Sequence, residues 1–180
     1  MPLLNSVTTP YAEALLQVVK EKDQTEEMVA EVKQILALIN DAPELEKTLS
    51  SPVLERETKK KIIIQIFSEK INVSLLNFLK LLADRQRIGI VTSILDRFLE
   101  IYRENSNIAL ATVTSAVELT DDQKGLITKK IIILAGTEKL ELVTKIDPSL
   151  IGGFVASVGS KVIDASLASQ IRKLGLSLSK

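Results

Sequence analysis

Residues 140 to 166 constrain the fold most, because their apolar residues alternate along the chain instead of following a helical period. Apolar and polar positions alternate from Leu140 onward, a pattern typical of a half-buried strand. Asp147 and Pro148 then stop the strand, since proline fixes φ and has no N–H to donate to a neighbouring strand. Gly152 and Gly153 permit a bend that a β-carbon would prevent, and the alternation resumes after them. The stretch therefore predicts a strand, a turn, a second strand, another turn and a short third strand.

Residues up to about 105 follow a different period, with apolar residues three or four positions apart in six successive stretches. In the first of these predicted helices, Thr9 is the expected cap and Pro10 lies in the first turn. Burying one Leu or Ile is worth roughly 1.5–3 kcal/mol, and short helices are marginal alone, so packing must hold them together. The short connections favour a compact antiparallel bundle. The six apolar stripes begin at Tyr11, Met28, Leu45, Ile62, Leu75 and Val91.

A polar run at 103–107 separates the two kinds of periodicity, and we expect the domain boundary after residue 105. Beyond it, Ile108–Val117 is rich in β-branched residues and predicts a strand. Thr120 and Gln123 form a capping box that opens a helix, Gly136 closes this helix, and a last helix is expected at about 166–178. The predicted fold class is mainly α, with an N-terminal six-helix bundle in residues 1–105 followed by a small α+β domain in residues 106–180.

The composition excludes several classes of function. Lys plus Arg equals Asp plus Glu, at 23 each, which argues against a nucleic-acid or anionic-membrane surface. The chain has no Cys and no His, so it lacks thiol chemistry, the usual general base and the commonest metal ligand. No apolar run approaches the ~20 residues of a membrane span, and no signal peptide is expected. The sequence predicts a soluble protein that reaches a membrane only through partners.

Three features resemble reactive or binding motifs, but their spacing does not support one. The segment from Gly153 to Lys161 resembles a P-loop, yet it is one residue too long, its Ser and Lys are reversed, and it leads into a strand. The many carboxylates fall in first helical turns or on polar faces, where they complement the helix dipole. Lys59–Lys61 reads as a solvated face, since no aromatic residues are interleaved with it. We expect no catalytic residue, no metal site and no cofactor.

Two predicted helices have apolar faces wider than one core contact requires. In the first, Leu16 lies beside Leu15. In the fifth, a second row runs along Leu76, Leu79 and Ala83. Two interpretations remain open: the bundle buries wide faces, or the two helices form a groove that receives an amphipathic helix of a partner.

Several segments, in a fixed order, resemble one family over essentially the whole chain. They are PYAEALL, LSSPVL, LLNFLKLLADRQRIGIV, ATVTSAVELT, IDPSLIGGF and VGSKVIDAS. This order is similar to that of the delta subunits of F-type ATP synthases, whose mitochondrial counterpart is the oligomycin-sensitivity-conferring protein. TTPYAEALL and LLADRQRIGIV resemble the cyanobacterial and plastid branch. The chain departs from the pattern at 168–170, where Ala-Ser-Gln stands in place of the Arg-Gly-Gln-like segment of many relatives.

The resemblance implies a non-catalytic stator subunit, present in one copy per complex, that links the catalytic headpiece to the peripheral stalk and so couples proton flow to ATP synthesis. Its N-terminal bundle is expected to bind the N-terminal helix of an alpha subunit in a groove of the first and fifth helices. Its C-terminal domain is expected to bind the peripheral-stalk b subunits. The implied groove residues are Tyr11, Ala14, Leu15, Val18, Leu76, Leu79, Lys80 and Ala83. The implied stalk contacts are Leu167, Ile171 and Leu174, and the structural turn contains Asp147, Pro148, Gly152 and Gly153.

Two other functions compete with this interpretation. A generic helical adaptor, binding an amphipathic helix of some other partner, is compatible with the composition. A nucleotide-binding enzyme is disfavoured by the broken phosphate motif. If the resemblance holds, the expected location is the thylakoid membrane of a cyanobacterium or plastid, otherwise a bacterial inner membrane.

Overall fold

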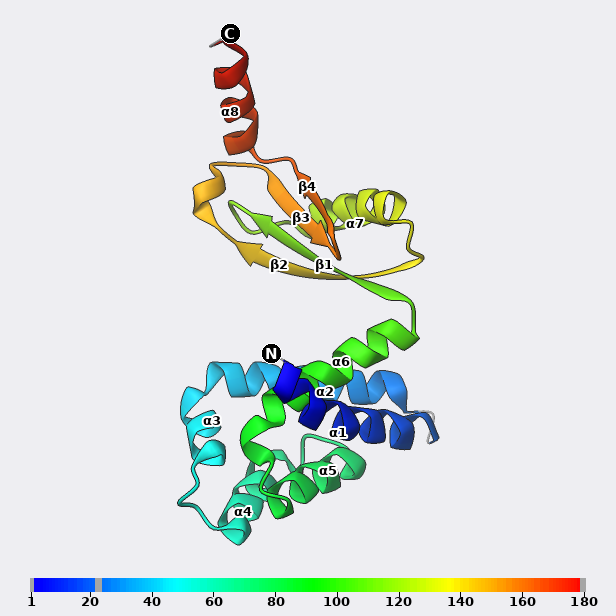
Figure 1. Cartoon of the computed structure of the whole chain (residues 1–180), viewed down its shortest axis with the longest axis vertical. Helices are drawn as coiled ribbons and strands as arrows, with labels where there is room; N and C mark the ends of the chain where they lie inside the picture. Colours follow the sequence, from blue (N-terminus) through cyan, green and yellow to red (C-terminus); the bar gives the residue numbers. More distant parts are fainter. Residues whose placement is uncertain (1, 22–23, 179–180) are drawn as a thin grey trace. The chain divides into compact units, whose positions relative to one another are not determined.

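Six α-helices make up the first part of the chain, as the apolar periodicity predicts (Figure 1). The computed structural model describes residues 2–21 and 24–178. The chain consists of two compact units, the first ending at Tyr102 and the second beginning at Arg103, three residues before the expected boundary. The helices are α1 (Pro2–Glu21), α2 (Thr25–Asp41), α3 (Pro43–Ser50), α4 (Arg56–Phe67), α5 (Val73–Asp84) and α6 (Val91–Asn105), with a 3-10 turn η1 (Ile88–Ile90) before α6.

The apolar stripes of these helices meet in one core. Its largest fully buried side chains include Met28, Ile63, Leu79 and Phe98, which come from α2, α4, α5 and α6. Asn72 caps α5, since its Oδ1 accepts a hydrogen bond from the Ser74 N–H at 2.9 Å. The Asn72 N–H donates to Glu31 of α2 at 2.9 Å, which ties the start of α5 to α2.

The first helix begins earlier than expected, and Pro10 lies inside it. The burial pattern explains this difference, because Thr8 is buried in register with Ala12 and Leu15. Packing therefore continues N-terminal to the proline and offsets the backbone hydrogen bond that proline removes. Thr9 is not a cap, and its hydroxyl accepts a hydrogen bond from Arg97 Nε of α6 at 3.3 Å.

The second unit is a four-stranded sheet with the strand order β2-β1-β3-β4. β1 (Ile108–Ser115) pairs in parallel with β2 (Lys139–Ile146), and α7 (Asp121–Ala135) connects them. β3 (Phe154–Val158) is antiparallel to β1, and β4 (Lys161–Asp164) is antiparallel to β3. α8 (Leu167–Leu178) follows β4. α7 packs on one face of the sheet, where Ile127 and Ile131 join Ala111, Val113 and Ala156 in a small core.

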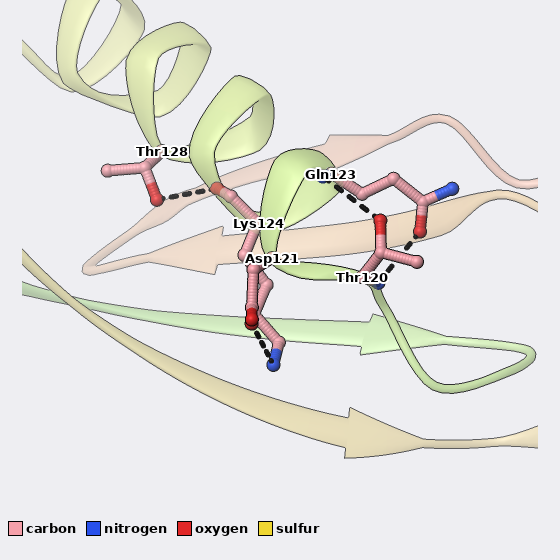
Figure 2. A network of polar contacts seen from close by, with 5 residues as sticks. All are labelled: Thr120, Asp121, Gln123, Lys124 and Thr128. Carbon is pink, nitrogen blue, oxygen red and sulfur yellow. Dashed lines mark hydrogen bonds and ion pairs between the residues drawn. The ribbon is translucent and has the colours of Figure 1, made fainter.

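Both ends of α7 follow from the local sequence, as predicted. The Thr120 hydroxyl accepts a hydrogen bond from the Gln123 N–H at 3.4 Å, and the Gln123 side chain accepts one from the Thr120 N–H at 3.0 Å (Figure 2). Gly136 ends the helix in the left-handed conformation, with φ +72°. A capping box and a left-handed glycine satisfy backbone groups that helix ends leave unpaired.

Among the helices in the described part of the chain, none is both long and apolar enough to cross a membrane.

Candidate partner-binding surfaces

The four candidate residues of α1 differ in burial. Leu15 is buried in the bundle together with Ala12, Leu16 and Val19. Ala14 is exposed, Val18 is 43% exposed, and Tyr11 is half-buried against the core. Tyr11, Ala14 and Val18 are spaced by three and four residues, so they form one row along the helix. This outer row can meet a partner without any change in the bundle.

The candidates of α5 lie mostly inside the bundle. Leu76, Leu79 and Ala83 are buried members of the core, and Lys80 is half-buried. The apolar residues that α5 does expose are Val73, at 69%, and Leu81, at 44%. The apolar pattern identified neither residue, because eight of the twelve positions of VSLLNFLKLLAD are apolar and they occupy more than one side of the helix. A partner on α5 would therefore contact Lys80 and Leu81, with Leu76, Leu79 and Ala83 supporting the surface from within.

Charged side chains tie α5 to α4. The Lys60 ammonium forms ion pairs with Asp84 of α5 and with Glu57 one turn before it in α4. These bonds, to Asp84 first and Glu57 second, raise the pKa of Lys60 above its ordinary value. The contact with Asp84 links the two helices at the surface of the bundle.

A hollow of about 620 Å³ opens beside this contact, lined in part by Arg56, Lys59, Ala83 and Gln86. Its carboxylates, Glu55 and Glu57, are exposed. Across the part of the chain that the structure describes, no three His, Cys, Asp or Glu residues cluster in a way that could hold a metal ion.

The P-loop-like segment has the wrong structure for binding phosphate. Gly153 precedes β3, and Gly159 and Ser160 form the turn to β4, so Lys161 begins a strand. A P-loop presents the N–H groups of a helix N-terminus to phosphate. The structure therefore gives the nucleotide-binding alternative no site in this segment.

The predicted structural turn between β2 and β3 is held by backbone contacts. The Asp147 N–H donates to the Ser115 carbonyl at 2.8 Å, and Asp147 Oδ1 accepts from the Ser149 N–H at 2.9 Å. Pro148 opens the 3-10 turn η2 (Pro148–Leu150). Gly152 accepts a hydrogen bond from the Leu167 N–H at 2.9 Å, and Gly153 has φ +76°. The turn thus connects the sheet to the start of α8.

Two of the three candidate stalk residues are exposed. Leu167 and Ile171 of α8 present apolar surface to solvent. The Leu174 side chain lies outside the described part of the chain. Leu167 also packs on Gly152, since a β-carbon there would come within 2.6 Å of Leu167 Cδ1.

Comparison with known proteins gives one consistent answer. The sequence matches the family "ATP synthase delta (OSCP) subunit" over residues 7–178. The "ATP synthase subunit delta" of Prochlorococcus marinus MED4 is 93% identical over 180 residues, covering 100% of both chains. The protein of the same description from strain MIT 9303 is 56% identical over 100% of this chain and 99% of its own length.

A solved structure shows the same fold. A chain of the cryo-EM structure of the Toxoplasma gondii mitochondrial ATP synthase hexamer superimposes with a TM-score of 0.71, at 20% identity, covering 96% of this chain and 97% of that one. The family match extends over both units described above. The chain therefore belongs to the ATP synthase delta (OSCP) subunit family.

Proposed function

We propose that the two units of this chain bind different parts of an ATP synthase, one the catalytic headpiece and the other the peripheral stalk, and so connect them rigidly. The chain is a non-catalytic stator subunit that links the catalytic headpiece to the peripheral stalk. In our proposal the N-terminal bundle binds the N-terminal helix of an alpha subunit, and the C-terminal unit binds the b subunits of the stalk. One copy serves each complex.

The observation that carries this proposal is the 93% identity over the full length of both chains to a subunit described as delta. The surface chemistry supports it. Tyr11, Ala14 and Val18 form an accessible row with a small residue at its centre, which allows a close approach of a second helix.

A stator joint needs tight binding and a rigid body, not a reactive group. When the central shaft turns, the joint must resist torque so that rotation changes the conformation of the headpiece. Apolar anchors desolvated in a groove supply such affinity, and a nanomolar complex corresponds to about 12 kcal/mol. With no His in the chain and equal numbers of acidic and basic residues, this binding depends little on mild changes of pH.

The relatives come from Prochlorococcus marinus, a cyanobacterium, which favours the thylakoid membrane as the location. In this proposal the chain reaches that membrane only through the subunits it binds.

Calorimetric titration with a synthetic peptide of the alpha-subunit N-terminus tests the proposal. A scrambled peptide of the same composition that still forms an amphipathic helix is the matched control. Tight binding of the native peptide alone supports a dedicated alpha site. Equal binding of both peptides supports the generic helical adaptor, and binding of neither overturns the assignment of the bundle.

A further inference from the structure

β2 lies at an edge of the sheet and pairs with β1 on one side (Figure 1). Among the residues that the structure describes, no strand lies on its other side, so its outward N–H and C=O groups have no strand partner. β2 is eight residues long, whereas proteins usually keep exposed edge strands short or interrupt them with a bulge or a proline. Pro148 comes only after the strand has ended. The edge can therefore accept a partner strand over its whole length.

The two halves of β2 differ in burial. The first half is mostly half-buried, and Leu140 and Leu142 pack against the core that α7 covers. The second half, from Val143 onward, is exposed. Ile146 lies on the same face of the sheet as Leu140 and Leu142, since side chains alternate along a strand, yet it is 60% exposed. Apolar surface is therefore uncovered at the C-terminal end of the edge.

The sequence of this edge is complementary to itself when a second copy runs antiparallel to it about Val143. Residues directly opposite each other then lie on the same face of the joined sheet and contact each other. All four charged residues of 139–147 meet the opposite charge, and the exposed Ile146 meets Leu140. The facing pairs are Lys139 with Asp147, Glu141 with Lys145 and Val143 with itself on the face away from α7, and Leu140 with Ile146 and Leu142 with Thr144 on the α7 face.

The charges also disfavour the neighbouring registers. A shift by two residues in one direction places Lys139 opposite Lys145, and a shift in the other direction places Glu141 opposite Asp147. Like charges directly opposite each other destabilise a strand pair. Glu141 already forms an ion pair with Arg103, at 2.7 Å between Arg103 Nε and Glu141 Oε2, and this contact holds its carboxylate at the face where Lys145 of a second copy arrives. One register is therefore preferred.

We propose that the edge of β2 binds a second copy of this chain, strand against strand and antiparallel about Val143, so that two four-stranded sheets become one. The contact is isologous, with a two-fold symmetry axis at Val143. Main-chain hydrogen bonds hold the strands together, and the charge pairs select the register. The inference goes beyond the proposed function, because it concerns the chain before it joins a complex that takes one copy. The interface is small, so the dimer is reversible, with a Kd on the order of 10–100 µM.

Sedimentation equilibrium of the full chain up to about 300 µM tests the proposal, since this range extends beyond the expected Kd. Lys145→Glu places two carboxylates opposite each other at both ends of the symmetric contact and weakens the dimer by about tenfold or more at low salt. Glu141→Lys does the same with two ammonium groups. A mixture of the two variants in equal amounts restores the dimer, because each copy then offers the charge that the other one needs.

The matched control is Lys129→Glu, which makes the same change of charge at an exposed lysine of α7. It keeps the Kd of the dimer within about a factor of two, since surface changes outside an interface are nearly neutral. Thermal melting reports whether each variant folds. If Glu141→Lys fails to fold because Arg103 loses its partner, Lys145→Glu and Lys139→Glu decide the question. Both lysines are exposed, and Lys139→Glu faces Asp147 of the second copy.

Two results overturn the inference. An unaltered chain that stays monomeric up to about 300 µM shows that the edge does not bind a second copy. A dimer that persists unchanged in both Lys145→Glu and Lys139→Glu shows that the copies meet elsewhere. Neither result touches the stator role, because titration with the alpha-subunit peptide tests that role separately.

Discussion

The turn between β2 and β3 restricts which residue types can occupy individual positions. Ile151 and Gly153 both have positive φ, at +64° and +76°. A β-carbon on Gly153 would collide with the Ala165 carbonyl oxygen and come within 3.1 Å of Ser166 Cα. The position therefore excludes side chains both through its backbone conformation and through the close approach of another segment.

We predict that Gly153→Ala lowers the free energy of unfolding of the second unit by about 2 kcal/mol or more, because strain and overlap add. Gly125→Ala is the matched control. Gly125 lies inside α7 with no atom within 4 Å of an added β-carbon, so its replacement stabilises by about 0.5–1 kcal/mol. Urea denaturation measures both changes, and equal effects at the two glycines would contradict the account of the turn.

Asp147 gives a second prediction for this turn. Its carboxylate accepts hydrogen bonds from the Ser149 side chain and from the Ser149 backbone N–H, and these hold the pKa of Asp147 below its usual value. A carboxyl group with a lowered pKa stabilises the fold above the pKa of the unfolded chain, and the effect is lost as pH falls through the folded value. The turn thus weakens in acid below about pH 4.

Ser149→Ala removes the hydroxyl donor and should raise the pKa of Asp147 toward the ordinary value, as measured by NMR titration of the side-chain carboxyl. The backbone N–H donor remains, so the shift is reversed only in part. An unchanged titration in the variant would show that the hydroxyl has no role.

Sequence patterns predicted the bend at the glycines and the stop at Pro148, because each residue type acts through its own backbone. They did not predict the positive φ of Ile151, since a β-branched residue rarely adopts that conformation. Ile151 ends the 3-10 turn η2, where its N–H donates to the Pro148 carbonyl at 3.2 Å, and the alternation of apolar residues does not record this conformation.

Among whole elements, α1 provides the sharpest test of the alpha-subunit site. Ala14 is exposed and Ala12, two residues earlier, is fully buried. We predict that Ala14→Asp weakens binding of the alpha peptide by about tenfold or more, because the carboxylate would be desolvated on binding. Its free energy of unfolding should stay within about 0.5 kcal/mol of the unaltered value.

Ala12→Asp is the control for this prediction, because the same substitution on the same helix now enters the core. It should cost about 3 kcal/mol or more, or prevent folding of the bundle. Calorimetry reports the affinity and thermal melting reports the stability. Normal affinity in the Ala14 variant would move the site away from the outer row of α1.

The spacing of apolar residues predicted which helices and strands form more reliably than it predicted which of their faces are buried. All six N-terminal helices and the capping box of α7 agree with the sequence prediction. In α5 and α7, however, apolar residues occupy more than one side. Which side is buried depends on neighbouring elements far along the chain, so local spacing could not identify the exposed Leu81 or Ile133.

For the whole molecule, the change near residue 105 from helical spacing to strand alternation was informative. The helical spacing belongs to a core between helices, and the alternation belongs to a core between a sheet and a helix. One buried cluster draws its residues from Ala12 to Ile101, and the other from Ala111 to Ala156. The order of the strands was not predictable in the same way. β1 pairs in parallel with β2 on one side and antiparallel with β3 on the other, and such long-range pairing leaves no trace in the alternation of a single strand.

Because each unit has its own core, we expect a substitution in one core to destabilise its own unit and not the other. This can be tested in the full chain. We predict that Gly153→Ala, at about 2 kcal/mol or more, lowers the melting temperature of the second unit by about 8 °C or more and leaves the bundle unchanged, since about 1 kcal/mol shifts Tm by roughly 4–8 °C in units of this size. Leu79→Ala should do the reverse, because Leu79 is buried in the first core and its truncation costs about 2–5 kcal/mol. Calorimetry detects the transitions, and hydrogen exchange followed by mass spectrometry assigns each one to its unit. If either substitution lowered the protection of both units equally, the chain would unfold as one cooperative body. A substitution that destabilises the C-terminal unit would then also destabilise the bundle, and the alpha-binding and stalk-binding roles could not be separated by mutation.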